Sequence, residues 1–90
     1  ATDLSDRRLE VSRQLGINLA LNPKRDDVLA RIEEYTDGKG ADVVIESSGS
    51  PKAFLQGCAA AGYYARIAVI GWILNPCQFN MSDAFTPKGL

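Results

Sequence analysis

The apolar residues of this chain follow a helical spacing in some stretches and a strand-like pattern in others. One stretch repeats them about every 3.6 residues, as one face of a helix does: Val28, Leu29, Ile32, Tyr35 and Thr36. The acidic residues Asp26 and Asp27 precede it, and negative charge is favourable at a helix N-terminus. The runs ADVVIE at 41–46 and ARIAVIG at 65–71 are instead continuous, as in strands covered on both faces. We therefore expect a helix over about 28–36, followed by two buried strands.

Capping residues predict two further helices. Ser5 is suited to cap a helix over about 6–15, and Gly16 stands where glycine usually follows a helix C-terminus. The residues expected on the broad apolar side of this helix are Leu9, Val11, Ser12 and Leu15. Ser50 as cap and Pro51 at the first helical position predict the start of the other helix.

Three weaker signals complete the pattern of strands. The apolar run INLALN at 17–22 ends at Pro23 and suits a buried strand, while CQFNM at 77–81 alternates apolar and polar residues. Residues 1–3 are similar to the last residues of a strand. Strands and helices that alternate with short connections predict a parallel sheet with right-handed helical crossovers. The expected fold class is therefore α/β, in one domain over residues 1–90.

Composition and charge exclude several classes of protein. The net charge is −1 and the basic residues are scattered, so nothing indicates a nucleic-acid partner. The longest apolar stretch, 67–74, is far shorter than the roughly 20 residues that span a bilayer. With no histidine and two cysteines, the sequence lacks the four ligands of a structural zinc site. Cys58 falls on an apolar helix face, so we expect a buried, inert thiol. The two cysteines are not spaced as a redox pair, so we expect a reducing, cytoplasmic compartment.

In open parallel sheets, ligands bind beyond the carboxyl ends of the strands, and three segments of this chain are expected there. The first contains Asp3, since an acidic residue at the end of the second strand of a dinucleotide-binding fold accepts hydrogen bonds from the adenosine ribose. Arg8 lies one helical turn further on, although a cation in the first turn opposes the helix dipole. A ligand contact would explain its presence. The alternative is that Asp3 is a turn residue and that Arg8 extends into solvent.

The second and third segments follow the two central strands. In ESSGSPK, Gly49 permits a ligand to approach the backbone closely, and Ser48 offers a small hydroxyl. The alternative is a tight turn that needs glycine and a cap for its own geometry. In VIGW, Gly71 and Trp72 end a strand, and Trp72 suits either a ring of the ligand or simple packing. The glycines of DGKG at 37–40 precede a strand, so we interpret them as turn residues and not as a phosphate loop.

Several stretches, in this order, carry a family resemblance: TDLSDRRLEVSRQLG, NPKRDDV, IEEYTDGKGADVVIESSGSPKAF, RIAVIG and FTPKGL. They resemble the coenzyme-binding domain of medium-chain dehydrogenases/reductases, the zinc alcohol dehydrogenase superfamily, and most of all its polyol and threonine dehydrogenase branches. The resemblance covers nearly the whole chain. It implies a Rossmann-type sheet and an enzyme that passes a hydride between a secondary alcohol and NAD.

The resemblance also assigns cofactor contacts to residues at three strand ends: Asp3, Arg8, Ser48, Gly49, Ile70, Gly71 and Trp72. The aspartate and the arginine match residues that bind the adenosine ribose. The serine and the glycine after it match a loop along the adenine and nicotinamide-ribose side, and the last three match a strand end that faces the nicotinamide. No residue of this chain matches a catalytic residue or a metal ligand, so zinc is expected only in a catalytic domain outside it.

Two departures from the family pattern bear on these expectations. AGYYA stands before RIAVIG in place of a Pro-Gly-Gly turn, and the first strand with its glycine-rich phosphate loop is absent. We therefore expect part of an NAD-binding domain that is inactive alone. Asp3 favours NAD over NADP, because a phosphate charge about 4 Å from a carboxylate costs about 4 kcal/mol at a dielectric near 20. One third of that is already about tenfold in affinity, although Arg7 and Arg8 offset part of it.

The expected partners are NAD, a small alcohol or polyol substrate of the complete enzyme, and further copies of the protein. A second interpretation, which places the chain in a non-enzymatic class of protein, stays open. In it the chain is a non-enzymatic α/β module that associates with itself through an exposed sheet edge, since unpaired edges recruit other strands.

Overall fold

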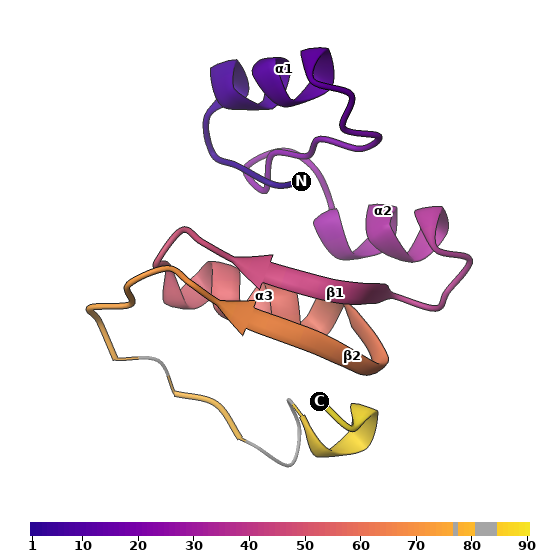
Figure 1. Ribbon diagram of the computed structural model, residues 1–90, viewed down its shortest axis with the longest axis vertical. Helices are drawn as coiled ribbons and strands as arrows, with labels where there is room; N and C mark the ends of the chain where they lie inside the picture. Colours follow the sequence, from indigo (N-terminus) through magenta and orange to yellow (C-terminus); the bar gives the residue numbers. More distant parts are fainter. Residues whose placement is uncertain (77, 81–84) are drawn as a thin grey trace. The chain divides into compact units, whose positions relative to one another are not determined.

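The computed structural model describes residues 1–76, 78–80 and 85–90. Contacts divide the chain into two compact units, Ala1–Arg31 and Ile32–Leu90, and the boundary lies inside helix α2 (Val28–Tyr35). Figure 1 shows the order of the elements along the chain. The second unit contains two parallel strands joined by a helix, which confirms the predicted α/β fold class.

Both predicted N-caps are confirmed. Helix α1 (Asp6–Gln14) follows Ser5, and helix α3 (Pro51–Ala60) follows Ser50. In each case the serine Oγ accepts a hydrogen bond of 3.3 Å from a backbone N–H of the first turn. Gly16, just past the end of α1, has a φ of +96°, which glycine adopts without strain. These helix ends follow from local chemistry alone.

The apolar side predicted for α1 is only partly buried. Leu9 is fully buried, whereas Val11 and Leu15 are 47% and 80% exposed. Leu21, 3% exposed, is another buried apolar residue of the first unit. Leu9 is therefore the one residue of this helix that lies in the core of the unit.

The strand predicted at 17–22 does not form, and this prediction was wrong. One parallel bridge, Thr2 to Leu21, stands in its place. The Leu21 N–H donates to the Ala1 carbonyl at 2.9 Å, and the Asp3 N–H donates to the Leu21 carbonyl at 3.2 Å. A strand needs a partner over several residues, and within this unit only residues 1–3 run beside it. The expectation that residues 1–3 are extended agrees with this pairing.

Asn22 is a buried polar residue of the first unit, 2% exposed. Its Nδ2 donates to the Leu4 carbonyl at 3.2 Å and to Asp6 Oδ1 at 3.1 Å. Hydrogen bonds from Asn22 and then from Arg25, whose Nη1 lies 2.6 Å from Asp6 Oδ1, hold the pKa of the Asp6 carboxyl below its ordinary value. The Asn22 amide therefore joins the segment that follows α1 to the N-terminal end of that helix.

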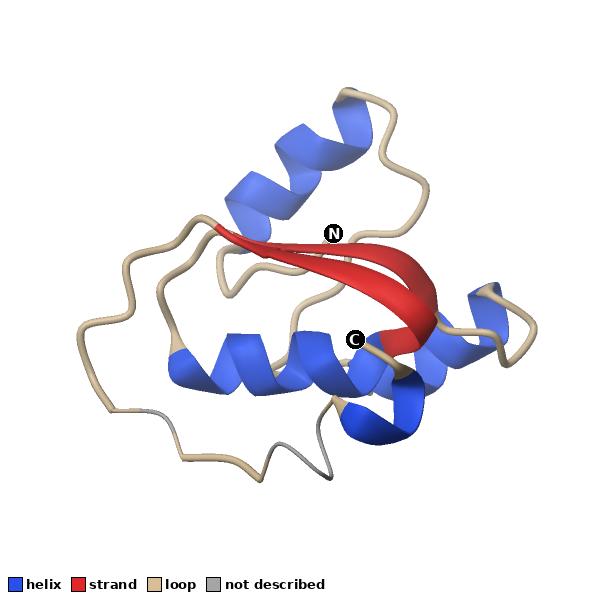
Figure 2. Ribbon diagram, turned by 60° about the horizontal axis from the view of Figure 1, so that its bottom comes forward, coloured by secondary structure: helices blue, strands red, loops and turns tan. Residues whose placement is uncertain are grey.

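In the second unit, strands β1 (Ala41–Glu46) and β2 (Ala61–Val69) pair in parallel, with α3 between them in sequence. Figure 2 shows α3 lying along one face of this pair. Val44 is on that face, since a Cβ added at Gly57 of α3 would lie 2.9 Å from Val44 Cγ1.

The opposite face of the same strands is open within this unit. Val43 and Ile45 alternate with Val44 along β1, and they are 59% and 65% exposed. The prediction that the run at 41–46 is covered on both faces was therefore wrong for this unit. In the part of this unit that the structure describes, α3 and the short helix η1 (Thr86–Lys88) contact the strands, and Val43 and Ile45 stay exposed beside both.

Strand β2 begins at Ala61, four residues earlier than its sequence predicts. The register shifts between Ala41 and Val43 of β1, and Tyr64 has a φ of +58°. Such an irregularity admits extra residues into one strand of a pair. Tyr63 and Tyr64 lie within this early part of the strand and are 76% and 83% exposed.

Lys88, in the short helix η1 (Thr86–Lys88), caps the end of α3 from 30 residues away. Its Nζ donates to the carbonyls of Cys58, Ala59 and Ala61 at 3.2, 2.9 and 2.7 Å. The last carbonyls of a helix lack partners within the helix and carry partial negative charge, which an ammonium group stabilises.

We expect Lys88→Met to lower the stability of the protein by about 1 kcal/mol, because three carbonyls lose a charged donor. Thermal unfolding should show this as a fall of roughly 4–8 °C. Lys52→Met is the matched control, since the exposed Lys52 lies in the first turn of the same helix, where a cation is unfavourable. Equal melting temperatures for the two variants would contradict the capping role.

Two further predictions from the sequence are a weak strand near the end of the chain and the absence of a membrane-spanning segment. The weak strand at 77–81 falls partly on residues 77 and 81, which lie outside the described residues, and residues 78–80 form no strand. Among the described residues, no helix has the length and apolarity needed to cross a bilayer.

Candidate functional site

The loops that follow β1 and β2 are held together at the carboxyl end of the sheet. The backbone carbonyl of Glu46 accepts hydrogen bonds from the N–H groups of Ile70 at 2.8 Å and Gly71 at 3.0 Å. The structure thus brings the two predicted segments, Ser48–Gly49 and Ile70–Trp72, to one edge.

Glycine is required at two positions of this edge. Gly49 has a φ of +76°, and a Cβ there would lie 2.5 Å from the Trp72 carbonyl oxygen. A Cβ at Gly71 would lie 2.4 Å from the Gly49 nitrogen. Contacts under 3.0 Å with backbone atoms leave no room for a side chain. The close neighbour of each glycine is therefore the other loop, while the positive φ of Gly49 is what the tight-turn alternative expects.

Glu46 also holds the first loop through its side chain. Its Oε1 accepts hydrogen bonds from the Ser48 backbone N–H at 2.8 Å and from the Ser48 hydroxyl. The Ser48 hydroxyl oxygen in turn accepts from the Ser50 N–H at 3.1 Å. Glu46 is 5% exposed, and its Oε2 has no hydrogen-bond partner among the described residues. Sequence reasoning missed Glu46, although an acidic residue that ends an apolar run was a signal.

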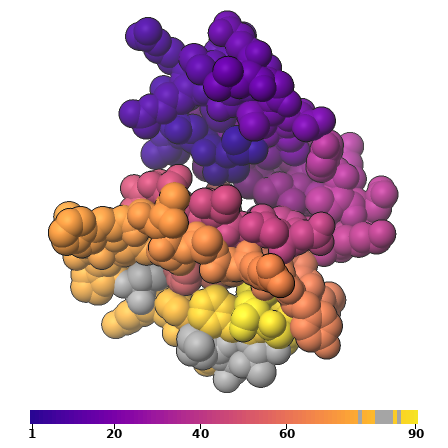
Figure 3. Space-filling model, in the orientation of Figure 1, coloured from indigo at the N-terminus to yellow at the C-terminus, as the bar shows by residue number. Residues whose placement is uncertain are grey.

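The outer surface of this edge is open. Ile70 is 71% and Trp72 is 84% exposed, and Ser48 is exposed as well. Figure 3 shows the segment after β2, in orange, projecting at the surface of the second unit. A ligand can therefore reach these residues from solvent.

Asp3 and Arg8 form the other predicted group, in the first unit. Asp3 Oδ1 accepts a hydrogen bond from the Ser5 N–H at 2.8 Å, and Asp3 Oδ2 lies 3.9 Å from Arg8 Nη1. The Asp3 side chain is 31% exposed and the Arg8 side chain is 78% exposed. The structure thus places the two side chains beside each other, while most of Arg8 extends into solvent, as the alternative interpretation expects.

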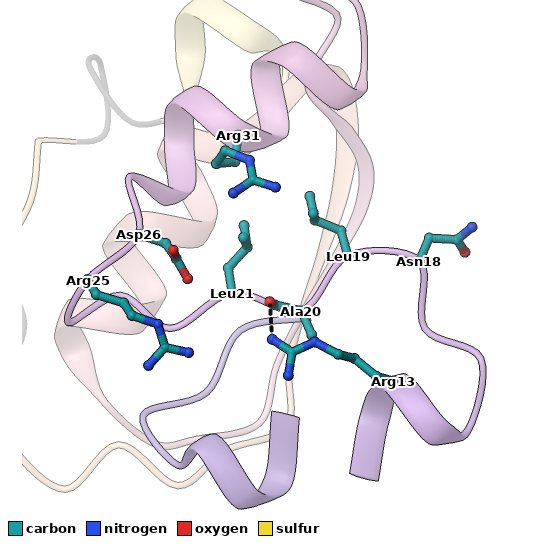
Figure 4. Close-up of a pocket in the computed structure, with 8 residues that line it drawn as sticks. All are labelled: Arg13, Asn18, Leu19, Ala20, Leu21, Arg25, Asp26 and Arg31. Atoms are coloured by element: carbon teal, nitrogen blue, oxygen red, sulfur yellow. Dashed lines mark hydrogen bonds between the residues drawn. The ribbon is translucent and has the colours of Figure 1, made fainter. Parts of the chain in front are cut away.

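The first unit also has a hollow of about 300 Å³, lined by Arg13, Asn18, Leu19, Ala20, Leu21, Arg25, Asp26 and Arg31 (Figure 4). None of the sequence-predicted site residues lines it. Arg13 lies 3.2 Å from Glu10 and also donates to the Ala20 carbonyl, and Arg25 pairs with Asp6. With most of this charge already balanced, the hollow does not indicate an anion site.

The described residues contain no group of three or more His, Cys, Asp or Glu side chains that could hold a metal ion. The described cysteine, Cys58, is buried in α3, as predicted. The side chains present in this part of the chain therefore do not fit a zinc ion.

The family described as zinc-binding dehydrogenase matches the whole chain, residues 1–90. An L-threonine 3-dehydrogenase of Symbiobacterium thermophilum is 38% identical over 90 residues, which are 100% of this chain and 26% of that protein. The same enzyme of Pyrococcus abyssi is 39% identical over 86 residues, 96% of this chain and 25% of that protein. The chain thus spans about a quarter of the length of these relatives.

Solved structures share the fold. The benzyl alcohol dehydrogenase of Acinetobacter calcoaceticus matches with a TM-score of 0.81 at 39% identity, over 92% of this chain and 23% of its own. An alcohol dehydrogenase of Thermotoga maritima matches with a TM-score of 0.88 at 26% identity, over 97% of this chain and 25% of its own. The predicted Rossmann-type α/β fold is confirmed by these structures.

Proposed function

This chain belongs to the zinc-binding dehydrogenase family, and we propose that residues 1–90 are part of the NAD-binding Rossmann domain of an alcohol, polyol or threonine dehydrogenase. The relatives named above are threonine and alcohol dehydrogenases. The reaction proposed for the complete enzyme is hydride transfer between a secondary alcohol and the nicotinamide of NAD. The proposed partners are NAD, a small alcohol or polyol substrate, and further copies of the protein. The proposed location is the cytoplasm.

The observation that carries the proposal is the loose pair of Asp3 and Arg8. Their closest side-chain atoms are 3.9 Å apart, which is too long for a hydrogen bond. An exposed ion pair of this kind adds little to stability. Both groups therefore retain hydrogen-bonding capacity for a third group. A ribose diol suits them, since its hydroxyls both donate to a carboxylate and accept from a guanidinium.

The edge formed by the loops after β1 and β2 is proposed to hold the nicotinamide half. Its exposed Ser48 hydroxyl and the open surface at Ile70 and Trp72 fit a sugar and an aromatic ring. NAD, when bound there, would supply the ring that takes up the hydride. The described residues supply binding and orientation, and none of them is proposed as a catalytic residue or a zinc ligand.

Binding to this chain is expected to be weak. Its sequence contains no G-x-G-x-x-G, so no glycine-rich loop places a helix N-terminus against the pyrophosphate. We therefore expect a Kd for NAD of about 1 mM and no dehydrogenase activity from these 90 residues.

A titration of the ¹⁵N-labelled protein with NAD, followed by amide NMR, tests this function. We expect saturable shifts at Asp3–Arg8, at Ser48–Gly49 and at Ile70–Trp72, with NADP binding about tenfold more weakly. No saturable shift at these residues, or a Kd of 1 μM or less, would contradict the proposal.

Self-association remains the second candidate, because the open face of β1 exposes Val43 and Ile45. Parallel strands are normally covered on both faces. A dimer that forms with rising concentration in size-exclusion chromatography, together with an absence of NAD-induced shifts, would favour this candidate.

A further inference from the structure

We infer that Glu46 is the positioning residue of the nicotinamide end of the proposed coenzyme site, and that it fixes Ser48 as a hydrogen-bond acceptor for a ribose hydroxyl. This inference rests on the proposed function and extends it to a residue that lies outside the predicted set. Glu46 ends β1 and is 5% exposed, so it acts from beneath the loops and does not touch the ligand itself.

One residue joins the two loops of the edge. The Glu46 carbonyl accepts from the N–H groups of Ile70 and Gly71, and its Oε1 accepts from the N–H and the hydroxyl of Ser48. The backbone of Glu46 thus holds the loop after β2, and its side chain holds the loop after β1. A binding residue held by buried hydrogen bonds loses less conformational entropy when the ligand binds.

The hydrogen bonds also set the polarity of Ser48. Its hydroxyl proton is donated to Glu46 Oε1, and one lone pair accepts from the Ser50 N–H at 3.1 Å. A hydroxyl has one donor and two acceptor positions, so one lone pair remains. Because Ser48 is exposed, that lone pair is available to a hydroxyl group of a ligand and to no acceptor.

The packing around Oε2 shows that the carboxylate and the glycines fit as a set. A Cβ at Gly71 would lie 2.9 Å from Glu46 Oε2. Glycine at position 71 therefore makes room for the carboxylate as well as for the Gly49 backbone. Oε2 has no hydrogen-bond partner in the part of the chain that the structure describes, and burying an unpaired polar atom is unfavourable.

The test compares nicotinamide mononucleotide with AMP in amide NMR titrations of the wild type and of two variants at this position. Glu46→Met fills a similar volume without an acceptor, whereas Glu46→Gln keeps one carbonyl oxygen for Ser48. We expect the affinity for nicotinamide mononucleotide to fall about tenfold in Glu46→Met and to stay within about threefold in Glu46→Gln. Affinity for AMP, bound at Asp3 and Arg8, should be unchanged in both. Glu34→Met, at an exposed position of α2, is the control and should bind both ligands as the wild type does.

Three further outcomes separate the inference from the proposed function. The inference alone would be overturned if Glu46→Met bound nicotinamide mononucleotide as strongly as the wild type does. The same holds if Glu46→Met lost equal affinity for nicotinamide mononucleotide and for AMP. No binding to the wild type would overturn the proposed nicotinamide site and the inference with it. If Glu46→Met does not fold, Ser48→Ala takes its place, since this exposed change removes the acceptor directly and should give the same tenfold loss.

Discussion

Gly49→Ala should unfold most of the protein or lower its melting temperature by roughly 15 °C or more. Two effects add at this position. A residue with a Cβ is strained at a φ of +76°, by about 1–2 kcal/mol. The added Cβ would also lie 2.5 Å from the Trp72 carbonyl oxygen, a backbone atom that cannot rotate away. Together they cost roughly 3 kcal/mol or more, a large fraction of the stability of a small domain. Thermal or urea unfolding measures the loss.

Gly38→Ala isolates the first of these effects. Gly38 belongs to the same unit and has a nearly equal φ of +78°, but a Cβ there meets nothing within 4 Å. We expect only the strain, about 1–2 kcal/mol. If Gly49→Ala were no more destabilising than Gly38→Ala, the two loops would not be packed as described.

Asp3→Ser should shift the ratio of NAD affinity to NADP affinity about tenfold toward NADP. The substitution removes the carboxylate charge that repels a 2′-phosphate, and at about 4 Å this repulsion is about 4 kcal/mol at an effective dielectric near 20. Solvent and the nearby Arg8 reduce it, so we take one third of that value. Serine keeps an oxygen that can accept from the Ser5 N–H, as Asp3 Oδ1 does at 2.8 Å. Paired titrations with the two dinucleotides give the ratio.

Asp27→Ser is the matched control for this change. Asp27 is exposed where Asp3 is half-buried, and its Oδ1 likewise accepts a hydrogen bond from a nearby backbone N–H, that of Ala30 at 3.2 Å. It lies outside the proposed site, so the ratio should stay at the wild-type value. An unchanged ratio in Asp3→Ser, or an equal shift in both variants, would count against the assignment of Asp3.

Features set by neighbouring residues could be predicted from the sequence, and features set by distant ones could not. Ser5 and Ser50 cap helices, and Gly16 follows one, because each acts on its own first or last turn. The prediction of a strand at 17–22 was wrong because strand pairing depends on a partner elsewhere in the chain. Lys88 was not found as a cap, because its contacts with the end of α3 span about 30 residues.

In the candidate site, too, local features could be predicted from the sequence and features set by distant residues could not. The spacing of one helical turn predicted that Asp3 and Arg8 lie close, and the structure places them 3.9 Å apart. The resemblance predicted the residues of the other edge, and Gly49 and Gly71 do meet there. Glu46 was overlooked, because a sequence does not show that one acidic side chain among many is 5% exposed and bonded to Ser48. The ligand contacts of all these residues stay predictions.

A structure of the protein with NAD bound tests the central claim most directly. The account predicts that Asp3 Oδ2 accepts a hydrogen bond from the adenosine ribose and that the Arg8 guanidinium contacts the same sugar or its phosphate. A bound dinucleotide from which both side chains point away would contradict it.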